Sequence, residues 1–128
     1  MEGVRKYSPV IGRVLIALIF ILFGFAKITD FSSNLGYMQA FNVPFTAFVL
    51  VIAIAIELLG GLSLVLGLKT KWGAGALIIY TAIITLIFHT NLADQTQLIQ
   101  FMKNLAIIGG LILIANYGPG PFSLDKKR

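Results

Sequence analysis

The segment from Phe45 to Leu68, FTAFVLVIAIAIELLGGLSLVLGL, decides the fold of this chain. Its length fits a helix that crosses a bilayer, since one span needs about 20 predominantly apolar residues. A lone carboxylate, Glu57, stands near its middle. A charged side chain at that depth costs roughly 2.5–3.5 kcal/mol on insertion scales, so it is usually paired or functional. The segment therefore predicts a membrane helix with one buried ionisable residue.

Three further segments have the length and apolar composition of membrane spans. The four predicted spans cover approximately residues 9–28, 45–68, 72–90 and 101–117. The chain has 128 residues, of which 58% are hydrophobic and 12% charged, and a soluble domain this small could not bury so much apolar surface. The sequence predicts an all-α protein, a four-helix transmembrane bundle that forms a single domain over residues 1–128.

The formal net charge of +5 is distributed unevenly along the chain. Basic residues precede the first span at 5–6, lie between the second and third at 69–71, and end the chain at 126–128. Because positive residues near span ends stay in the cytoplasm, both termini are predicted to be cytoplasmic, as an even number of spans requires. The excess of basic residues therefore indicates the orientation of the chain in the membrane. Nucleic acid is not an expected partner.

A short polar segment, TDFSSNLGYMQAFNVP, separates the first two spans at residues 29–44. Phe31, Leu35 and Met38 follow helical spacing, and Asp30 is a candidate N-cap. Aromatic residues in the segment favour the depth of the lipid headgroups. We therefore expect a short interfacial helix here, with a plain loop as the alternative.

Helical spacing places the polar residues of the first two spans on inward faces. One face of the first span carries Arg13, Ala17, Phe20, Gly24 and Lys27, and one stripe of the second carries Ala53, Glu57, Gly60, Gly61, Leu64 and Gly67. Small residues let membrane helices approach closely, so Glu57 should face protein. The estimated depths predict that Glu57 pairs with Arg13, while Lys27 lies near the opposite edge.

Four polar residues are predicted to gather at the outer end of the bundle: Lys27, His89, Lys103 and Asn104. We hypothesise that Glu57 and His89 exchange protons as catalytic residues, since histidine has an unperturbed pKa of about 6.5. Substrate binding is assigned to Arg13, Lys27, Lys103 and Asn104, with an anionic or carbonyl-bearing small molecule as the ligand. The structural alternatives are a Glu–Arg pair that locks two helices, lysines that extend to water, and a histidine at the membrane boundary.

The chain contains no cysteine and one histidine. Disulfides, thiolate metal sites and iron–sulfur clusters are therefore excluded, and one chain cannot supply two axial histidines to a haem. We expect no metal site and no covalently bound cofactor. A redox role would need a diffusible cofactor, with a quinone as the candidate, or a cofactor held by a partner.

The order and spacing of several motifs resemble the DoxX family of small bacterial membrane proteins. These motifs are IGRV with Arg13, FGFAKI with Lys27, GYMQAFNVP, IELLGGLSLVLGL with Glu57, His89, FMKNLAIIGGLILI, and the GPGPFSLDKK tail from Gly118. Asn42 stands where relatives often have glycine. The resemblance implies a four-helix protein of the bacterial inner membrane. The family name comes from a subunit linked to quinol oxidase and thiosulfate–quinone chemistry, which implies a quinone-interacting or redox-complex subunit.

Two other functions remain open at this point. The protein could be a proton-coupled small-solute transporter that uses Glu57, or a non-catalytic membrane anchor for soluble redox enzymes. The expected partners are the lipid bilayer, a quinone or other small ligand, and a soluble redox enzyme or a second copy of the chain. Whether the chain is itself an oxidoreductase subunit depends on which of these functions holds.

Overall fold

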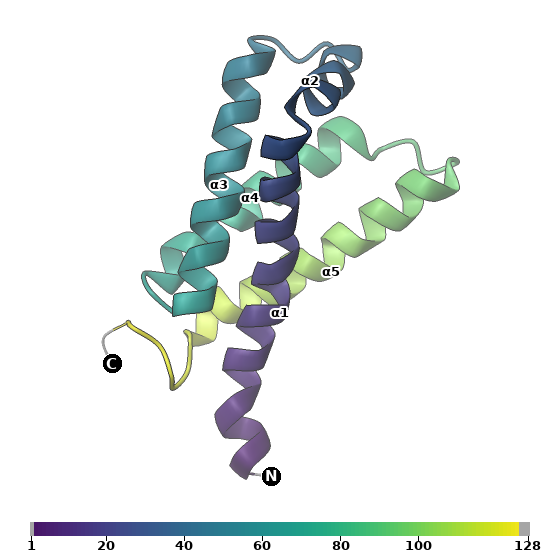
Figure 1. The fold of residues 1–128 in the computed structure, drawn as a ribbon. Coiled ribbons are helices and arrows are strands. Elements are labelled where there is room, and N and C mark those ends of the chain that lie inside the picture. The colour runs from purple at the N-terminus through teal and green to yellow at the C-terminus, as the bar shows by residue number, and fades with distance from the viewer. Residues whose placement is uncertain (1, 126–128) are drawn as a thin grey trace.

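The computed structural model describes the backbone of residues 2–125 and the side chains of residues 6–125. This part of the chain forms five α-helices and no strand: α1 (Glu2–Thr29), α2 (Phe31–Ala40), α3 (Thr46–Leu66), α4 (Thr70–Phe88) and α5 (Gln95–Tyr117) (Figure 1). All but α2 are long and apolar enough to cross a membrane. The predicted all-helical bundle with four spans is therefore confirmed.

The helix boundaries differ from the predicted spans mainly at two places. Helix α1 begins well before residue 9 and contains Pro9. Helix α5 begins at Gln95 instead of residue 101, because the Asp94 carboxylate accepts a hydrogen bond from the backbone N–H of Thr96 at 2.9 Å. Such a cap satisfies a backbone donor at the start of a helix. It lets α5 include the mostly polar residues 95–100, which the apolar span predicted from hydropathy did not include.

The segment between the first two spans forms α2, which confirms the predicted short helix. Asp30 precedes it as expected but makes no side-chain capping bond. The connection to α3 passes through Asn42 with φ of 58°, in the left-handed region that asparagine tolerates better than most residues with a side chain. Asparagine can therefore take the place of glycine in this turn.

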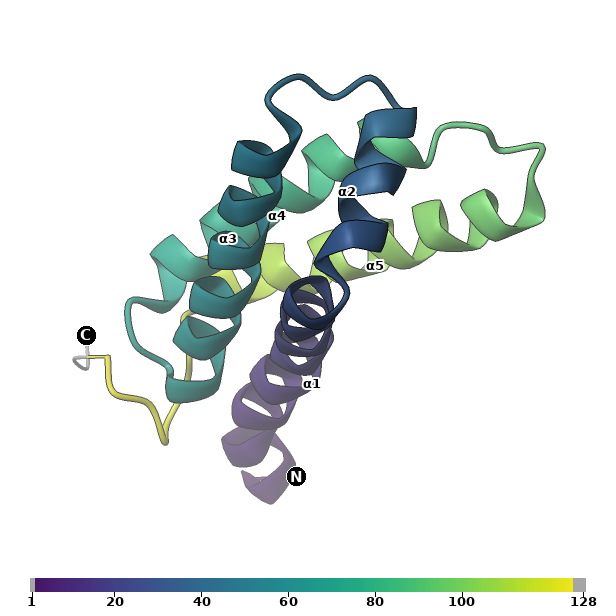
Figure 2. The same cartoon turned by 45° about the horizontal axis from the view of Figure 1, so that its top comes forward.

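The helices pack as two pairs. Helix α1 packs chiefly on α3, and α4 on α5, while α3 also contacts α4. Figure 1 and Figure 2 show α5 crossing α1 obliquely and then diverging from it, with α2 near the far ends of α1 and α3. Near the crossing, a Cβ on Gly110 would lie 2.7 Å from Cδ1 of Ile16. A cavity lined by residues of both helix pairs and of α2 lies in this part of the bundle.

The inward stripes predicted for the first two spans are confirmed. Buried positions include Arg13, Ala17, Phe20 and Gly24 on α1, and Ala53, Glu57, Gly60, Gly61 and Leu64 on α3. Large apolar side chains such as Leu15, Phe48, Leu59, Leu86 and Leu113 are exposed on the outside of the bundle. That pattern suits a protein surrounded by lipid, where apolar surface has no reason to be hidden.

Residues 118–125 fold back along the bundle beside the α3–α4 connection. The backbone N–H groups of Leu124 and Asp125 donate to the carbonyls of Leu66 and Gly67, at 3.0 Å and 2.8 Å. Gly67 has φ of 64°, and a Cβ there would clash with Cβ of Ser123. This region, with the N-terminal half of α1, is called the tail end below. The opposite region, around α2 and the α4–α5 loop, is called the cavity end.

The side of the membrane on which each end lies stays a prediction from the charge distribution. Lys126, Lys127 and Arg128, which contribute to that prediction, lie outside the described residues, as does the side chain of Arg5.

Candidate functional site

Glu57 pairs with Lys27. The Lys27 Nζ lies 3.0 Å from Oε1 of Glu57 and donates a hydrogen bond to Oε2 at 3.1 Å. The Glu57 side chain is 2% exposed and that of Lys27 is 21% exposed. The hydroxyl of Tyr80 on α4 also interacts with this carboxylate. A charge from α3 is thus compensated by α1 and α4, which brings three helices together at one point.

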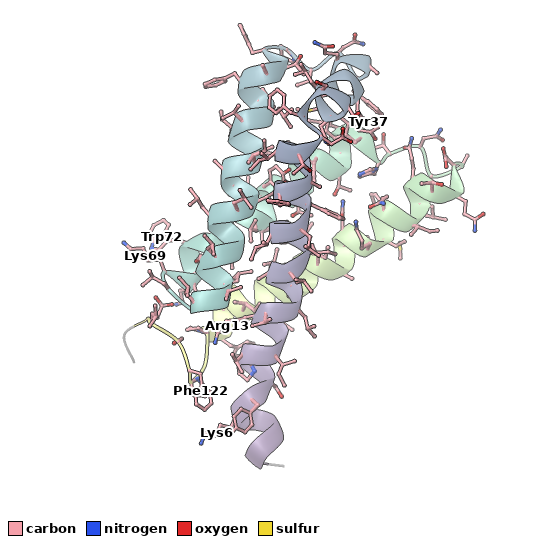
Figure 3. All side chains as sticks on the ribbon, viewed as in Figure 1. Lys6, Arg13, Tyr37, Lys69, Trp72 and Phe122 are labelled. Carbon is pink, nitrogen blue, oxygen red and sulfur yellow. The ribbon has the colours of Figure 1, made fainter. Side chains whose placement is uncertain are left out.

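The predicted pair between Glu57 and Arg13 is wrong. The Arg13 guanidinium donates from Nη1 to the carbonyl oxygens of Leu64 at 2.7 Å and Val65 at 3.3 Å, and from Nη2 to that of Phe122 at 3.1 Å. Figure 3 shows Arg13 and Phe122 together at the tail end. Arg13 therefore satisfies the last carbonyls of α3 and holds residues 118–125 in place.

The error comes from the relative depth of α1 and α3. The prediction aligned the two spans edge to edge, but Gly24 of α1 lies level with Glu57. A Cβ on Gly24 would lie 3.2 Å from Cβ of Glu57 and 2.9 Å from Cδ2 of Leu58, so a side chain at this position would require these neighbours to shift. Lys27 is one turn beyond Gly24, close enough to reach the carboxylate. Arg13, three turns before Gly24, lies beside the end of α3.

A cavity of about 680 Å³ lies between the helices at the cavity end. Its walls include residues from all five helices, and Glu57, Lys27, His89, Lys103 and Asn104 all line it. The structure thus brings together five of the six residues that the sequence assigned to a site. Arg13 does not line this cavity. A volume of about 300–1,000 Å³ is typical of small-molecule sites.

Most of the cavity wall is apolar. Isoleucines contribute much of it: Ile19, Ile52, Ile56, Ile79, Ile83, Ile84, Ile87 and Ile107. The polar groups converge on one part of this surface, where the Phe23 ring lies under two ammonium groups. The Nζ of Lys103 is 4.9 Å from the ring centroid and that of Lys27 is 5.7 Å from it. Cations are attracted to the face of an aromatic ring, so Phe23 positions both lysines beside the cavity.

A chain of hydrogen bonds joins α5 to α4 along another wall. Asn104 Nδ2 donates to Thr85 Oγ1 at 2.8 Å, and Thr85 Oγ1 donates to the Thr81 carbonyl at 2.6 Å. The hydroxyl of Thr81, a cavity residue that is 1% exposed, has no hydrogen-bond partner among the described residues. Buried polar atoms are normally satisfied, so this hydroxyl is available to a ligand or to water.

His89 ends α4 at the same side of the cavity. Its Nδ1 is buried and makes no hydrogen bond within the described part of the chain. Burial and the nearby ammonium of Lys103 lower the pKa of His89 from its usual value of 6.5. The imidazole is therefore neutral at pH 7, with one nitrogen that donates and one that accepts. A neutral histidine can give a proton to a ligand or take one from it.

Two residues of the site were not identified from the sequence. Tyr80 was overlooked, although a tyrosine in the middle of an apolar span needs a polar partner for its hydroxyl. Phe23 comes directly before Gly24, and in the sequence it has the features of an ordinary lipid-facing side chain. Its role emerges only because Lys27 and Lys103, from different helices, meet over its ring.

Residues 6–125 contain no group of three His, Asp or Glu side chains placed to hold a metal ion. The site is therefore built from donors, one carboxylate and one imidazole within apolar walls. Its fold and cavity define a class of protein: a membrane protein with several spans and a ligand-sized, mostly apolar cavity inside its helical bundle.

Comparison with known proteins identifies the family. The model of the DoxX family matches residues 8–90, and that of the SURF4 family matches residues 64–128. Inner membrane protein YqjF of Escherichia coli (strain K12) is 35% identical over 126 residues, which cover 98% of this chain and 95% of the relative. The chain belongs to the DoxX family, and it is a multi-pass inner membrane protein.

Two further relatives show how far the similarity extends. Inner membrane protein YphA of the same E. coli strain is 35% identical over 128 residues, with 96% of this chain and 91% of the relative covered. ER-derived vesicles protein ERV29 of Saccharomyces cerevisiae is 33% identical over 132 residues, which cover 99% of this chain but 36% of the yeast protein. No solved structure matches the chain.

Proposed function

We propose that the protein binds a quinone in the cavity between its helices and acts as a membrane subunit of a redox complex. The observation that carries this proposal is the combination of an apolar cavity with two lysines, an asparagine and a histidine at one end of it. A quinone has the matching chemistry, with a flat apolar ring and carbonyl oxygens that accept hydrogen bonds. Donors at Lys27, Lys103 and Asn104 would hold these oxygens.

The buried carboxylate supports a role in proton exchange. Reduction of a quinone to a quinol takes up two electrons and two protons. Glu57 lines the cavity in contact with Lys27 and Tyr80, and His89 is neutral at pH 7, so both can pass protons to the ring oxygens. The chain has no cysteine, so we assign the supply of electrons to a cofactor of a soluble redox partner.

A proton-coupled transporter is the second candidate, favoured by the same ion pair inside a cavity. Transport requires the cavity to open alternately toward both sides of the membrane. At the tail end, Arg13 and residues 118–125 hold α1, α3 and the chain's C-terminal segment together. These contacts would have to break in each cycle, which makes the transporter less favoured. The anchor function would need neither the cavity nor its donors.

The test is binding of quinone to the purified protein. Organic extracts of protein purified from membranes, analysed by mass spectrometry and absorbance, should contain a quinone. A short-chain ubiquinone analogue should bind to protein stripped of lipid, and Lys103→Met should weaken that binding by about tenfold, since a hydrogen bond from a charged donor contributes about 1.5–3 kcal/mol. Lys71→Met is the matched control, because Lys71 is exposed at the tail end.

Two results would contradict the proposal. One is an extract free of quinone together with no binding of the analogue. The other is an equal affinity of wild type, Lys103→Met and Lys71→Met, which would place the analogue on the lipid-facing surface. Accumulation of a solute in vesicles, driven by a proton gradient and lost in Glu57→Gln, would establish the transporter in its place.

A further inference from the structure

The charges around the cavity do not balance. The ionisable residues that line it come from every helix and from the end of α4: Lys27, Tyr37, Glu57, Tyr80, His89 and Lys103. Glu57 and Lys27 form the ion pair found within residues 6–125, and they neutralise each other. Lys103 has no carboxylate partner there. With His89 and the tyrosines neutral, the side chains that line the cavity carry one excess positive charge.

The position of Lys103 does not relieve this excess. Its ammonium lies over the Phe23 ring on the wall of the cavity, and the residue is half-buried. Lys27 lies over the same ring, and the two ammonium groups repel each other. The face of an aromatic ring offsets only part of the cost of a desolvated cation. An unpaired cation inside a membrane protein is costly, and such residues usually face a partner of opposite charge.

Two buried polar atoms without a hydrogen-bond partner within residues 6–125 belong to residues that line the same cavity. The hydroxyl of Thr81 is buried and without a hydrogen bond in the described part of the chain, and so is Nδ1 of His89. Both residues line the cavity that Lys103 lines. A ligand with an anionic oxygen would meet the ammonium of Lys103 and leave further oxygens for these two groups.

We propose that the cavity binds its ring ligand as an anion, a deprotonated hydroxyquinone or quinol, with Lys103 as the counter-charge. This inference rests on the proposed function, and it specifies the substrate class of the same site. Lys27 is engaged by Glu57 and serves as a hydrogen-bond donor, whereas Lys103 supplies the charge that the ligand needs. The hydroxyl of the ligand ionises by giving its proton to water or to His89. No electron is transferred in this binding step.

A matched pair of dyes tests the proposal. At neutral pH, 2-hydroxy-1,4-naphthoquinone is an anion, whereas 2-methoxy-1,4-naphthoquinone has the same ring and cannot ionise. Wild type should bind the hydroxy compound at least tenfold more tightly than the methoxy compound. Lys103→Gln keeps a donor but removes the charge, so it should abolish this preference by weakening the binding of the hydroxy compound at least tenfold more than that of the methoxy compound.

The absorbance of the hydroxy compound gives a second readout that needs no variant. Its colour changes when the hydroxyl ionises, so titration of the bound dye reports its pKa. Binding beside Lys103 should lower that pKa below the value of the free dye, because a nearby cation stabilises the anion. Lys71→Gln is the control variant and should leave preference and titration unchanged.

The outcomes separate this inference from the proposed function. Equal binding of the two dyes, with no pKa shift on binding, would overturn the inference while leaving a site for neutral quinones. Binding of neither dye would overturn both. A preference for the hydroxy compound that persists in Lys103→Gln would show that another group supplies the charge, and it would also overturn the inference.

Discussion

Arg13 and Glu57 are both charged residues buried between α1 and α3, but their surroundings differ. Arg13, at the tail end, is 0% exposed and donates to three backbone carbonyls. Glu57, at the cavity end, meets a single lysine and a tyrosine, and it lines an open volume. A buried charge whose hydrogen bonds all go to backbone carbonyls, with the carboxylate of Asp125 as its counter-charge, fastens the fold. One that borders a ligand-sized cavity can act on a ligand.

The largest effect is expected from breaking the pair between Lys27 and Glu57. Lys27→Met strands the Glu57 carboxylate, and loss of one partner from a buried pair typically costs about 3–5 kcal/mol. Glu57→Gln should cost less, since Lys27 is partly exposed and can turn toward water. The double variant should regain most of the stability but should not regain binding of the quinone analogue, because a donor of the site is missing.

The measurement is thermal unfolding in detergent, combined with the binding assay, on the wild type, both single variants and the double variant. A double variant that binds the analogue as tightly as wild type would show that the pair serves only to join α1 to α3. The contrast between the two ends of the bundle would then disappear.

A smaller loss of stability is expected at the tail end. Arg13→Gln removes the charged donor from the carbonyls of α3 and of Phe122, and should lower the free energy of unfolding by about 2–3 kcal/mol. Binding of the quinone analogue to the folded variant should be unchanged, since Arg13 does not line the cavity. Lys6→Gln, an exposed cation on the same helix, is the control. If Arg13→Gln weakened binding as much as Lys103→Met, Arg13 would belong to the site after all.

The smallest effect concerns the pH dependence of stability. The folded protein lowers the pKa of His89 from 6.5, so below pH 6.5 the unfolded chain binds a proton that the folded chain does not. The contribution of neutral His89 is therefore fully present above pH 6.5 and is lost as the pH falls toward the lowered pKa. The slope of Tm between pH 7 and pH 5 should be shallower in His89→Gln than in wild type. Identical slopes would mean that His89 titrates freely and faces water.

The sequence predicted the helical faces well because their causes are local. A spacing of three and four residues requires only that a helix forms, and it placed Lys27 and Glu57 toward the interior. A shared position at the outer ends of the spans grouped Lys27 with His89, Lys103 and Asn104. Helical spacing could not give the offset of α1 relative to α3 along the helix axes, because that offset depends on how Gly24 packs beside Glu57. The partner of Glu57 was therefore mistaken, while the membership of the cavity was largely predicted.

The true partners of Arg13 could not be predicted for a related reason. They are backbone carbonyls, which every residue has and which no sequence pattern distinguishes. One of them belongs to Phe122, which lies 109 positions from Arg13 in the sequence. Only the folded path of residues 118–125 brings that carbonyl to α1.

The start of α4 has a consequence for the order in which the protein assembles. Its first backbone N–H groups, those of Lys69 and Thr70, donate to the carboxylate of Asp125, and the bond to Thr70 spans 55 positions of the chain. A helix usually receives its cap from the residue just before it, as soon as that turn has left the ribosome. The cap of α4 can be supplied only after Asp125, which follows α5, has been synthesised. During biogenesis the start of α4 therefore receives this cap later than a helix that is capped by its own preceding residue.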